Sequence, residues 1–400
     1  MILVEKHIIN RNHKFFKDID SLSFASKNLY NYANYLIRQQ FIESGEVISI
    51  YKLIFLLKTH EAYKDLPAKV SQQILLLLGK NWKSFLVAIK DYNKNPHKYL
   101  GRPKLPKYKH KEKGRNILIY TIQAISKRQL KNNLIALSKT NIAFYSKIIK
   151  KLQQVRIIPR YSHYVIEVVY KTKTPEFKTS GNKMSIDLGV NNLGAVFVDN
   201  GNTYLINGKP LKTVNQFYNK TKSTLMSFIG DKGSSNRIEK LTFKRNMKIN
   251  DYLHKASKLI INLANYNNVN EIIIGFNSDW KQNIKLGKRN NQNFVNIPFK
   301  TYINMIVYKA ELEGIKVTLT EESYTSKIDH LVSEPLKKQT SYKGKRIKRG
   351  LFKSSTGKII NADINGAIGI MRKVVPNVVE KLTKGIEGIV VFPKLLTITT

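Results

Sequence analysis

The sequence predicts an α+β protein with more than one domain, and two features of its pattern lead to this fold class. In the first half, short strand-like segments lie on both sides of a long helical block. In the second half, short apolar strands alternate with helical stretches, which is typical of an α/β domain. A chain of 400 residues is long enough for two or three such domains.

The first half is predicted to be a β-domain with a helical insertion. Residues 1–10 alternate weakly and predict a first strand, and residues 20–95 carry apolar side chains at helical spacing. Leu29 and Ala33 illustrate that spacing, as do Ile74 and Leu78. Strand-like segments resume after the helical block, at residues 116–124, 142–145, 155–158 and 164–170.

The second half begins after residues 176–182, which are mostly polar and predict a domain boundary. Three strands are expected first, and the Asp199-Asn200-Gly201 turn joins the second to the third. A long helical stretch to about Tyr266 follows. The expected strands are 184–187, 194–199, 203–207, 271–275 and 315–320, and the later helices are 299–313 and 365–373.

The charge of the chain limits its partners. Lys and Arg number 69 against 27 Asp and Glu, which gives a net charge of +42. Such self-repulsion favours a polyanion as partner, and nucleic acid is the first candidate. The clearest apolar run, Ile74–Leu78, is far shorter than a membrane span, and charges at Glu5 and Lys6 argue against a signal peptide. The absence of cysteine excludes disulfides, thiolate zinc sites and cysteine nucleophiles, and fits a reducing cytoplasm.

Residues 101–115, GRPKLPKYKHKEKGR, have a composition unlike their surroundings. Seven of the fifteen residues are Lys or Arg. A solvated linker is one interpretation. The other is a nucleic-acid contact, because a tyrosine among lysines suits phosphate binding combined with base stacking. The predicted contact residues are Arg102, Lys104, Lys107, Tyr108 and Lys109.

Two acidic residues stand out in so basic a chain. Asp187 ends an apolar strand, and Asp363 lies where the last helix begins. Taken singly, the first resembles a turn residue and the second a helix N-cap. Together, with β-segments after the first, they indicate an RNase H-like nuclease. That chemistry needs carboxylates from separate elements to hold two Mg²⁺ ions about 3.5–4 Å apart.

Five stretches of the sequence together point to a known family. They are SIDLGVNNLGAVFVDNG, EIIIGFNSDWKQNIKLGKRNNQNFVNIPF, EESYTSK, GKRIKRGLFKSSTGKIINADINGAIGIMRK and the basic GRPKLPKYK. The first four resemble motifs of the TnpB family of RNA-guided nucleases encoded by insertion sequences, and GRPKLPKYK resembles the family's basic N-terminal motif. The resemblance is dense from about residue 180 to 373 and looser before that. The layout that it implies is a β-barrel-like wedge domain (1–15 and 98–178), a helical recognition insert (16–97), a RuvC-like nuclease domain (179–375) and a C-terminal tail (376–400).

The chain departs from the family pattern at the third acidic residue. The family glutamate that ends the strand at 271–275 is replaced by Gly275. Glu321 and Glu322 follow the next strand, and EESYTSK resembles a branch of the family with a relocated glutamate. Strand alternation places the two on opposite faces. Glu322 is favoured as the third catalytic and metal-binding residue beside Asp187 and Asp363, with Glu321 as the alternative.

A second departure is the missing zinc finger, whose place is taken by the basic insert 328–358. His330 is expected to be a surface residue rather than a ligand, and residues 341–350 to be a phosphate-contacting loop near the site. Its predicted contact residues are Lys343, Lys345, Arg346, Lys348 and Arg349. Trp280, with Lys281 and Gln282, is interpreted as a base-stacking or hinge residue, and Lys288–Asn293 as a mobile loop.

The resemblance implies an RNA-guided endonuclease that cuts double-stranded DNA beside a short target-adjacent motif. It implies two Mg²⁺ ions, replaceable by Mn²⁺, and no zinc. It also implies a guide RNA from the transposon end and a monomer on that RNA, in a prokaryotic cytoplasm, associated with the nucleoid and not with a membrane. Gly275 keeps open a nuclease-inactive RNA-guided repressor. An actin-like ATPase is disfavoured because no second phosphate loop is found, and the resemblance favours cutting over transposase strand joining.

Overall fold

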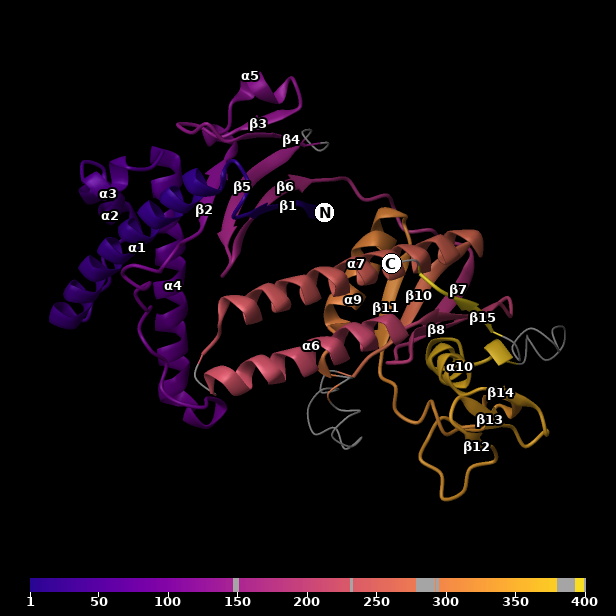
Figure 1. Cartoon of the computed structure of the whole chain (residues 1–400). Helices are drawn as coiled ribbons and strands as arrows, with labels where there is room; N and C mark the ends of the chain where they lie inside the picture. The colour runs from indigo at the N-terminus through magenta and orange to yellow at the C-terminus, as the bar shows by residue number, and fades with distance from the viewer. Residues whose placement is uncertain (147–150, 231–232, 278–291, 293–294, 380–392, 399–400) are drawn as a thin grey trace. The chain divides into compact units, whose positions relative to one another are not determined.

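A computed structural model describes residues 1–146, 151–230, 233–277, 292, 295–379 and 393–398. The chain divides into two compact units, Met1–Lys173 and Thr174–Thr400, and the predicted mixed α/β multidomain class is confirmed (Figure 1). The interpretations placed on Trp280–Gln282, and on Lys288–Asn293 apart from Gln292, fall outside the described residues.

Unit 1 contains a four-stranded antiparallel sheet in the order β1-β6-β5-β2. The first strand of the chain pairs along its whole length with β6, so the two ends of the unit meet in one sheet. In the described residues these strands form an open sheet, and a separate hairpin of β3 and β4 lies beside it. The strands are β1 (Ile2–Asn10), β2 (Leu118–Thr121), β3 (Leu134–Ala136), β4 (Ala143–Tyr145), β5 (Leu152–Pro159) and β6 (His163–Lys171).

The predicted helical block of unit 1 is confirmed, and short breaks divide it. Gly45 ends the first helix at a φ of +73°, a left-handed conformation that glycine adopts without strain. Ser49 starts the next helix because its hydroxyl accepts the backbone N–H of Lys52. The helices are α1 (Phe16–Ser44), α2 (Ile50–Leu57), α3 (Glu61–Lys64) and α4 (Ala68–Lys94), with a short α5 (Lys127–Leu130) later.

Unit 2 is built on a six-stranded sheet in the order β11-β10-β7-β8-β9-β15. The first three of its strands in the sequence form an antiparallel meander, and β10 and β11 are added in parallel beside β7. Lys394–Leu396, within the predicted tail, pairs with β9 at the other edge. The strands are β7 (Asn182–Asp187), β8 (Asn192–Val198), β9 (Thr203–Asn207), β10 (Val269–Gly275), β11 (Lys316–Thr320) and β15 (Lys394–Leu396).

Helices cover both faces of this sheet. On one face of the sheet, alternate strand residues such as Met184, Ile186 and Ile272 pack against α7 and α9. On the other face, the residues between them, such as Ile273, pack against α10. Burial on both faces explains why these strands read as unbroken apolar runs in the sequence. The helices are α6 (Lys209–Ile229), α7 (Asn236–Tyr266), α9 (Phe299–Leu312) and α10 (Ala362–Val374).

A small sheet fills the insert between β11 and α10. Its order is β12-β13-β14, with bounds Lys345–Lys348, Leu351–Lys353 and Ile359–Asn361. The prediction that residues 341–350 form a loop is therefore wrong in part. Lys345–Lys348 is a strand that pairs with the next one across a turn at Arg349-Gly350. Among the helices that the structure describes, none combines the length and apolarity that a membrane crossing needs.

Candidate active site

Three neighbouring parallel strands of unit 2, β7, β10 and β11, end at the same edge of the sheet, and Asp187 is the last residue of β7. Ile186 lies opposite Ile274, and Gly275 lies opposite Thr320. Asp187 shares a strand face with Ser185, whose hydroxyl donates to the carbonyl of Ala367 in α10 at 2.7 Å. The Asp187 side chain therefore extends toward α10 at this edge of the sheet.

Helix α10 brings Asp363 to the same edge. The amide oxygen of Asn361 caps the helix by accepting the N–H groups of Asp363 and Ile364, at 2.9 and 3.2 Å. An acidic residue in the first turn is also favoured by the helix dipole. From β8, the amide of Asn192 donates to Oδ2 of Asp363 at 2.7 Å and fixes its orientation. The helix cap and this hydrogen bond together hold the carboxylate in place.

Gly366, one turn into α10, lets Asp187 approach the helix. A Cβ atom at this position would lie only 2.4 Å from Oδ2 of Asp187. Any side chain there would push the carboxylate away from its position.

Glu322, rather than Glu321, is the glutamate that the structure brings to Asp187. Glu322 continues the alternation of β11 on the face of Thr320, and its N–H donates to the side-chain oxygen of Asn277 at 3.1 Å. A Cβ atom on Gly275 would lie 2.7 Å from both Cγ and Oε1 of Glu322. The Glu322 side chain thus fills the space that a side chain at position 275 would occupy, whereas Glu321 is exposed.

The carboxylates are close enough to affect one another. Burial, and then the charges of Glu322 and Asp363, raise the pKa of Asp187 well above its ordinary value, and Arg346 opposes the shift. An Arg346 guanidinium nitrogen lies 3.8 Å from Oδ1 of Asp363. A half-buried group of like charges with hard oxygen atoms is a donor set that fits divalent cations such as Mg²⁺. In the described residues no three acidic or His side chains are placed to hold one ion together.

A second polar cluster contacts α10 one turn farther along the helix, and we call Asp329, His330, Glu334 and Arg372 the Asp329 network. Oδ2 of Asp329 accepts the Ser354 hydroxyl and the Ser355 N–H, at 2.8 and 2.7 Å. The carboxylate of Glu334 accepts the N–H groups of Asp329 and Lys343, at 2.7 and 3.0 Å. These bonds hold the basic insert together, and Arg372 of α10 joins it to the helix by donating to His330 and to the Glu334 carbonyl.

His330 was predicted to be a surface residue, and that prediction is wrong because its side chain is fully buried. Nη1 of Arg372 donates to Nδ1 of His330 at 2.9 Å, so the ring proton is on Nε2, which donates to the Thr325 carbonyl at 2.7 Å. Burial lowers the pKa of His330 to about 4. The imidazole is therefore a neutral structural group.

The five predicted basic contacts of the insert are all exposed. Only Arg346, on β12, forms an ion pair with one of the carboxylates in the described residues. The others extend the positive charge away from that point along the hairpin. They are Lys343, Lys345, Lys348 and Arg349.

In unit 1, residues 101–115 form what we call the basic strap, which lies along α1. The amide of Asn31 exchanges hydrogen bonds with both the carbonyl and the N–H of Lys109, at 2.9 and 2.8 Å. Asn34 donates to the Pro106 carbonyl at 3.0 Å. Side chains of α1 thus form hydrogen bonds with the backbone of the strap. The side chains of the predicted contact residues remain exposed, and these are Arg102, Lys104, Lys107, Tyr108 and Lys109.

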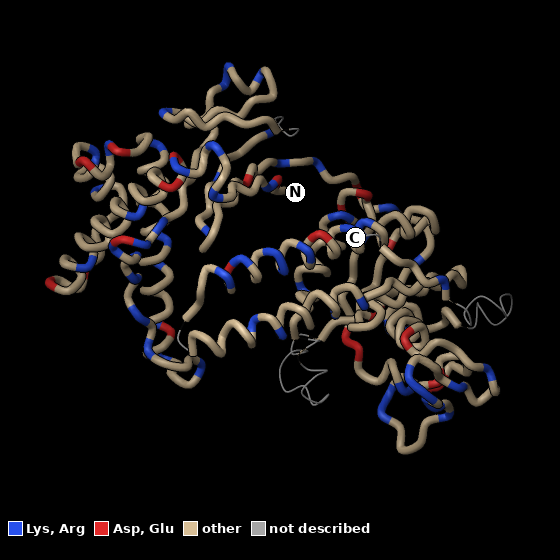
Figure 2. Tube along the Cα trace, in the orientation of Figure 1, with Lys and Arg blue, Asp and Glu red and all other residues tan. Residues whose placement is uncertain are grey.

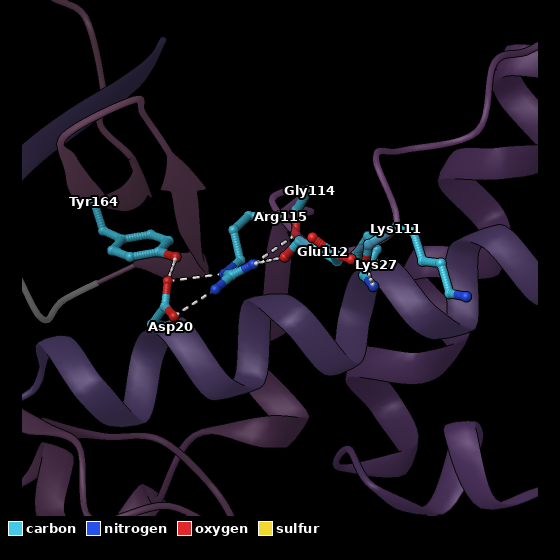
Figure 3. A network of polar contacts seen from close by, with 7 residues as sticks. All are labelled: Asp20, Lys27, Lys111, Glu112, Gly114, Arg115 and Tyr164. Atoms are coloured by element: carbon cyan, nitrogen blue, oxygen red, sulfur yellow. Dashed lines mark hydrogen bonds and ion pairs between the residues drawn. The ribbon is translucent and has the colours of Figure 1, made fainter. Parts of the chain in front are cut away.

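The end of the basic strap is anchored by an ion pair. The guanidinium of Arg115 donates to both carboxylate oxygens of Asp20, at 2.8 and 2.7 Å, and the Tyr164 hydroxyl donates to the same carboxylate at 2.6 Å (Figure 3). The hydrogen bond from Arg115 is the main reason why the pKa of Asp20 is lowered. Farther along, the Lys27 ammonium donates to the Lys111 carbonyl at 2.5 Å. The strap is thus fixed to one helix at several points.

Sequence reasoning missed three residues that position the carboxylates, namely Asn192, Asn277 and Gly366. Two asparagines in loops or strand ends give no signal of their own, because such residues are common there. Gly366 did give one, since a glycine inside a helix usually has a packing reason.

Comparisons with known proteins find a family, a relative and solved structures that the chain resembles. Residues 163–281 match a family model named OrfB_IS605 and described as "Probable transposase", and residues 299–370 match a Cas12f1-like TNB domain. The TnpB-like protein ORF457 of Acidianus two-tailed virus is 28% identical over 92% of this chain and 86% of its own. A cryo-EM structure of a Cas12f1-sgRNA-target DNA complex has a TM-score of 0.53 at 15% identity, over 89% of this chain and 82% of that one.

Proposed function

Because this chain belongs to the TnpB family, we propose that it is an RNA-guided DNA endonuclease, with Asp187, Glu322 and Asp363 as its catalytic residues. The observation that carries the proposal is the position of Glu322. Its carboxylate lies beside Gly275 and close enough to Asp187 to raise the pKa of that residue. A third acid is therefore available although the strand end at 275 offers none.

The three carboxylates would hold two Mg²⁺ ions, and Mn²⁺ would substitute. Two ions about 3.5–4 Å apart need acids that come from separate elements, as these three do. When bound, the ions activate water and stabilise the leaving oxygen. Asn192 keeps the Asp363 carboxylate oriented, and Arg346 supplies positive charge where a phosphate would enter.

The partners in this proposal are a guide RNA from the transposon end and a double-stranded DNA target. The Cas12f1 structure that resembles this chain is a complex with both kinds of nucleic acid. The exposed cations of the basic strap and of β12 would bind phosphates, and Tyr108 would stack on a base. Base pairing would read the target, and the protein would read only a short adjacent motif. The complex would act as a monomer on its RNA, in a prokaryotic cytoplasm near the nucleoid.

The test begins with the RNA that copurifies with the protein. Its sequence defines a guide, and a plasmid carrying the matching target is then incubated with the complex and Mg²⁺. We expect the wild-type complex to cut both strands, and Asp363→Asn to bind the RNA equally well without cutting. Glu321→Gln is the matched control, because that glutamate is exposed and should leave cleavage nearly unchanged. Full cleavage by Asp363→Asn would refute the site assignment.

Gly275 supports a second candidate, an RNA-guided repressor that binds DNA without cutting it. The two functions differ in one measurement. A repressor would bind the guided target in the presence of Mg²⁺ and leave it intact, and Glu322→Gln would change nothing. We favour the nuclease because the carboxylate of Glu322 lies in the space left by Gly275, beside the Ile370 side chain.

A further inference from the structure

The three acids of the proposed active site differ in how secondary structure supports them. Asp187 is the last residue of β7, and Asp363 lies in the first turn of α10. Glu322 belongs to neither kind of element, because β11 ends two residues earlier, at Thr320. Figure 2 shows the Glu321-Glu322 segment in red where the chain leaves the sheet for the insert. Contacts other than strand pairing must therefore fix the position of Glu322.

Thr325 supplies two of these contacts, and both go to the backbone carbonyl of Glu322. The Thr325 hydroxyl donates to this carbonyl at 2.8 Å, and the Thr325 N–H donates to it at 3.2 Å, which closes a turn over residues 322–325. Thr325 is buried, so these bonds are stronger than they would be in water. On its other side, the N–H of Glu322 donates to Asn277. The backbone of Glu322 is thus held by side chains at both of its polar groups.

The turn that Thr325 closes has a strained backbone. Tyr324, inside the turn, has a φ of +66°, a left-handed conformation that a bulky side chain rarely adopts. Strain of this kind persists only where the surrounding contacts fix the backbone. The bonds from Thr325 provide that constraint. Without the hydroxyl the turn would be free to relax, and the Glu322 side chain would move with it.

The same turn is attached to α10, the helix that carries Asp363. Nε2 of His330 donates to the Thr325 carbonyl at 2.7 Å, and Arg372 of α10 donates to Nδ1 of His330 at 2.9 Å. A Cβ atom on Gly369 of α10 would lie 2.8 Å from Cβ of Thr325, so the turn packs directly on the helix. Thr325 therefore connects the backbone of one proposed metal ligand to the helix that carries another.

We propose that Thr325 is a positioning residue for Glu322, and that its hydroxyl sets where the Glu322 carboxylate lies relative to Asp187 and Asp363. Mg²⁺ demands near-ideal octahedral geometry, so a displaced oxygen ligand binds it more weakly. Groups that orient a metal ligand typically contribute about 10- to 100-fold to metal affinity or activity. The inference rests on the proposed function for the identity of the three ligands.

The test measures Mn²⁺ binding to the full-length protein without RNA, from the electron paramagnetic resonance signal of the unbound ion. Asp363→Asn defines the site, because the binding that this variant loses belongs to the carboxylates. Thr325→Val keeps the shape of the side chain without its hydroxyl, and Thr325→Ser keeps the hydroxyl without the methyl group. We expect the Kd of the site for Mn²⁺ to rise at least about tenfold in Thr325→Val and less than about threefold in Thr325→Ser.

Thr140 of unit 1 provides a matched control. Its hydroxyl donates to the carbonyl three residues earlier, that of Leu137, at 2.9 Å, as the hydroxyl of Thr325 does to Glu322. Thr140→Val thus removes the same kind of bond in a unit that contains none of the three acids. It should leave the affinity for Mn²⁺ unchanged. An equal loss of Mn²⁺ affinity in Thr140→Val and Thr325→Val would indicate general destabilisation and overturn the proposal.

Cleavage by the RNA-bound complex gives a second measurement, in which the concentration of Mg²⁺ is varied. Thr325→Val should need about tenfold more Mg²⁺ than the wild type for half-maximal cleavage of the guided plasmid. Its affinity for the guided DNA should equal that of the wild type, and its melting temperature should stay close to that of Thr325→Ser. A variant with a damaged fold would instead lose DNA affinity together with cleavage.

The outcomes distinguish this proposal from the proposed function. Equal Mn²⁺ affinity of the wild type and Thr325→Val would overturn the positioning role, and so would an equal loss in Thr325→Ser, which would assign the effect to the methyl group. Binding that Asp363→Asn leaves intact would refute the metal site and this inference with it. If the wild-type complex cut no DNA while Thr325→Val still weakened the binding that Asp363→Asn removes, the nuclease function would fail and the positioning role would stand.

Discussion

Two polar clusters lie against the same helix, α10, and they are built on opposite principles. In the first cluster the carboxylates of Asp187, Glu322 and Asp363 repel one another. In the second, one turn along the helix, the Asp329 network pairs its acids and its imidazole with hydrogen-bond donors and acceptors. Buried polar groups that serve stability are normally satisfied in this second way. Acids held together in conflict are typical of groups placed for chemistry.

The helix accommodates both clusters through glycine. A Cβ atom at Gly366 would lie 2.4 Å from Asp187, and a Cβ atom at Gly369 would lie 2.5 Å from Nε2 of His330. A helical glycine therefore makes room both for the carboxylate cluster, which lowers the stability of the fold, and for the Asp329 network, which raises it. Substitutions in the carboxylate cluster should therefore lower activity and raise stability, whereas substitutions in the Asp329 network should lower stability.

The largest effect is expected for Asp187→Asn. Guided plasmid cleavage should fall by about 10⁴-fold, roughly 5 kcal/mol in the barrier, as for other essential catalytic groups. Because the pKa of Asp187 is raised in the folded state, its ionised form destabilises the protein at neutral pH. The variant should therefore melt at a higher temperature than the wild type in a buffer without divalent ions. A lower melting temperature would contradict the inference that ionised Asp187 is repelled by Glu322 and Asp363.

Asp329→Ala should have the opposite effect on stability. It removes the acceptor of Ser354 and Ser355 and leaves buried donors unsatisfied. We expect a loss of about 3–4 kcal/mol in the free energy of unfolding, measured by urea denaturation. Glu321→Ala, at an exposed acid, is the control and should cost less than about 0.5 kcal/mol. Equal stabilities of the two variants would mean that the Asp329 network does not hold the insert.

The Asp329 network should also give the protein an acid-sensitive component. The pKa of His330 is about 4 in the folded protein and about 6.5 when unfolded. Neutral His330 thus contributes stability above about pH 6.5, and this contribution is lost as the pH falls toward 4. The expected loss is about 2–3 kcal/mol, measured by denaturation at several pH values. His330→Gln should be less stable at pH 7 and should show a flatter response between pH 6.5 and 4.

Gly275→Ala should have the smallest of these effects. The added methyl group would lie 2.5 Å from Ile370 and 2.7 Å from Glu322, so the carboxylate would have to move. Overpacking of this kind costs about 1–2 kcal/mol, and we expect cleavage to slow by roughly tenfold. Gly101→Ala is the matched control, because a Cβ atom there meets nothing within 4 Å.

A double substitution makes this test sharper. In Gly275→Glu/Glu322→Ala the carboxylate returns to the strand end, and the contact with Glu322 is removed while that with Ile370 remains. Cleavage above that of Glu322→Ala alone would show that the two positions supply the same charge. No recovery would mean that the backbone of residues 320–322 contributes more than the carboxylate.

The sequence predicted those parts of the fold and site that depend on residues close together in the chain. The apolar run before Asp187 and the Asn361-Ala362-Asp363 start of the last helix were visible because strand burial and helix capping depend on neighbouring residues. The choice between Glu321 and Glu322 depends on how β11 pairs with β10. The identity of Glu321 or Glu322 gives no information on the register of two strands that are far apart in the sequence. The choice between the two glutamates therefore required the structure.

Long-range packing explains the remaining differences. A lone histidine in a polar stretch gave no sign that Arg372, forty-two positions later, would cover it. The first strand of this hairpin, β12, is a run of cations that resembles a loop in the sequence, since all four of its residues are exposed and carry little apolar pattern. The assignment of nucleic-acid contacts in both basic segments stays a prediction.

The sequence distance between Asp187 and Asp363 determines when this protein becomes competent. The two carboxylates meet across the sheet and α10, but 176 positions separate them in the chain (363 − 187). At synthesis rates of about 5–20 residues per second, roughly 10–35 seconds pass between translation of the first acid and of the second. During that interval the nascent polypeptide has the first acid without its partner, so the proposed active site is incomplete until the C-terminal part of the chain is made.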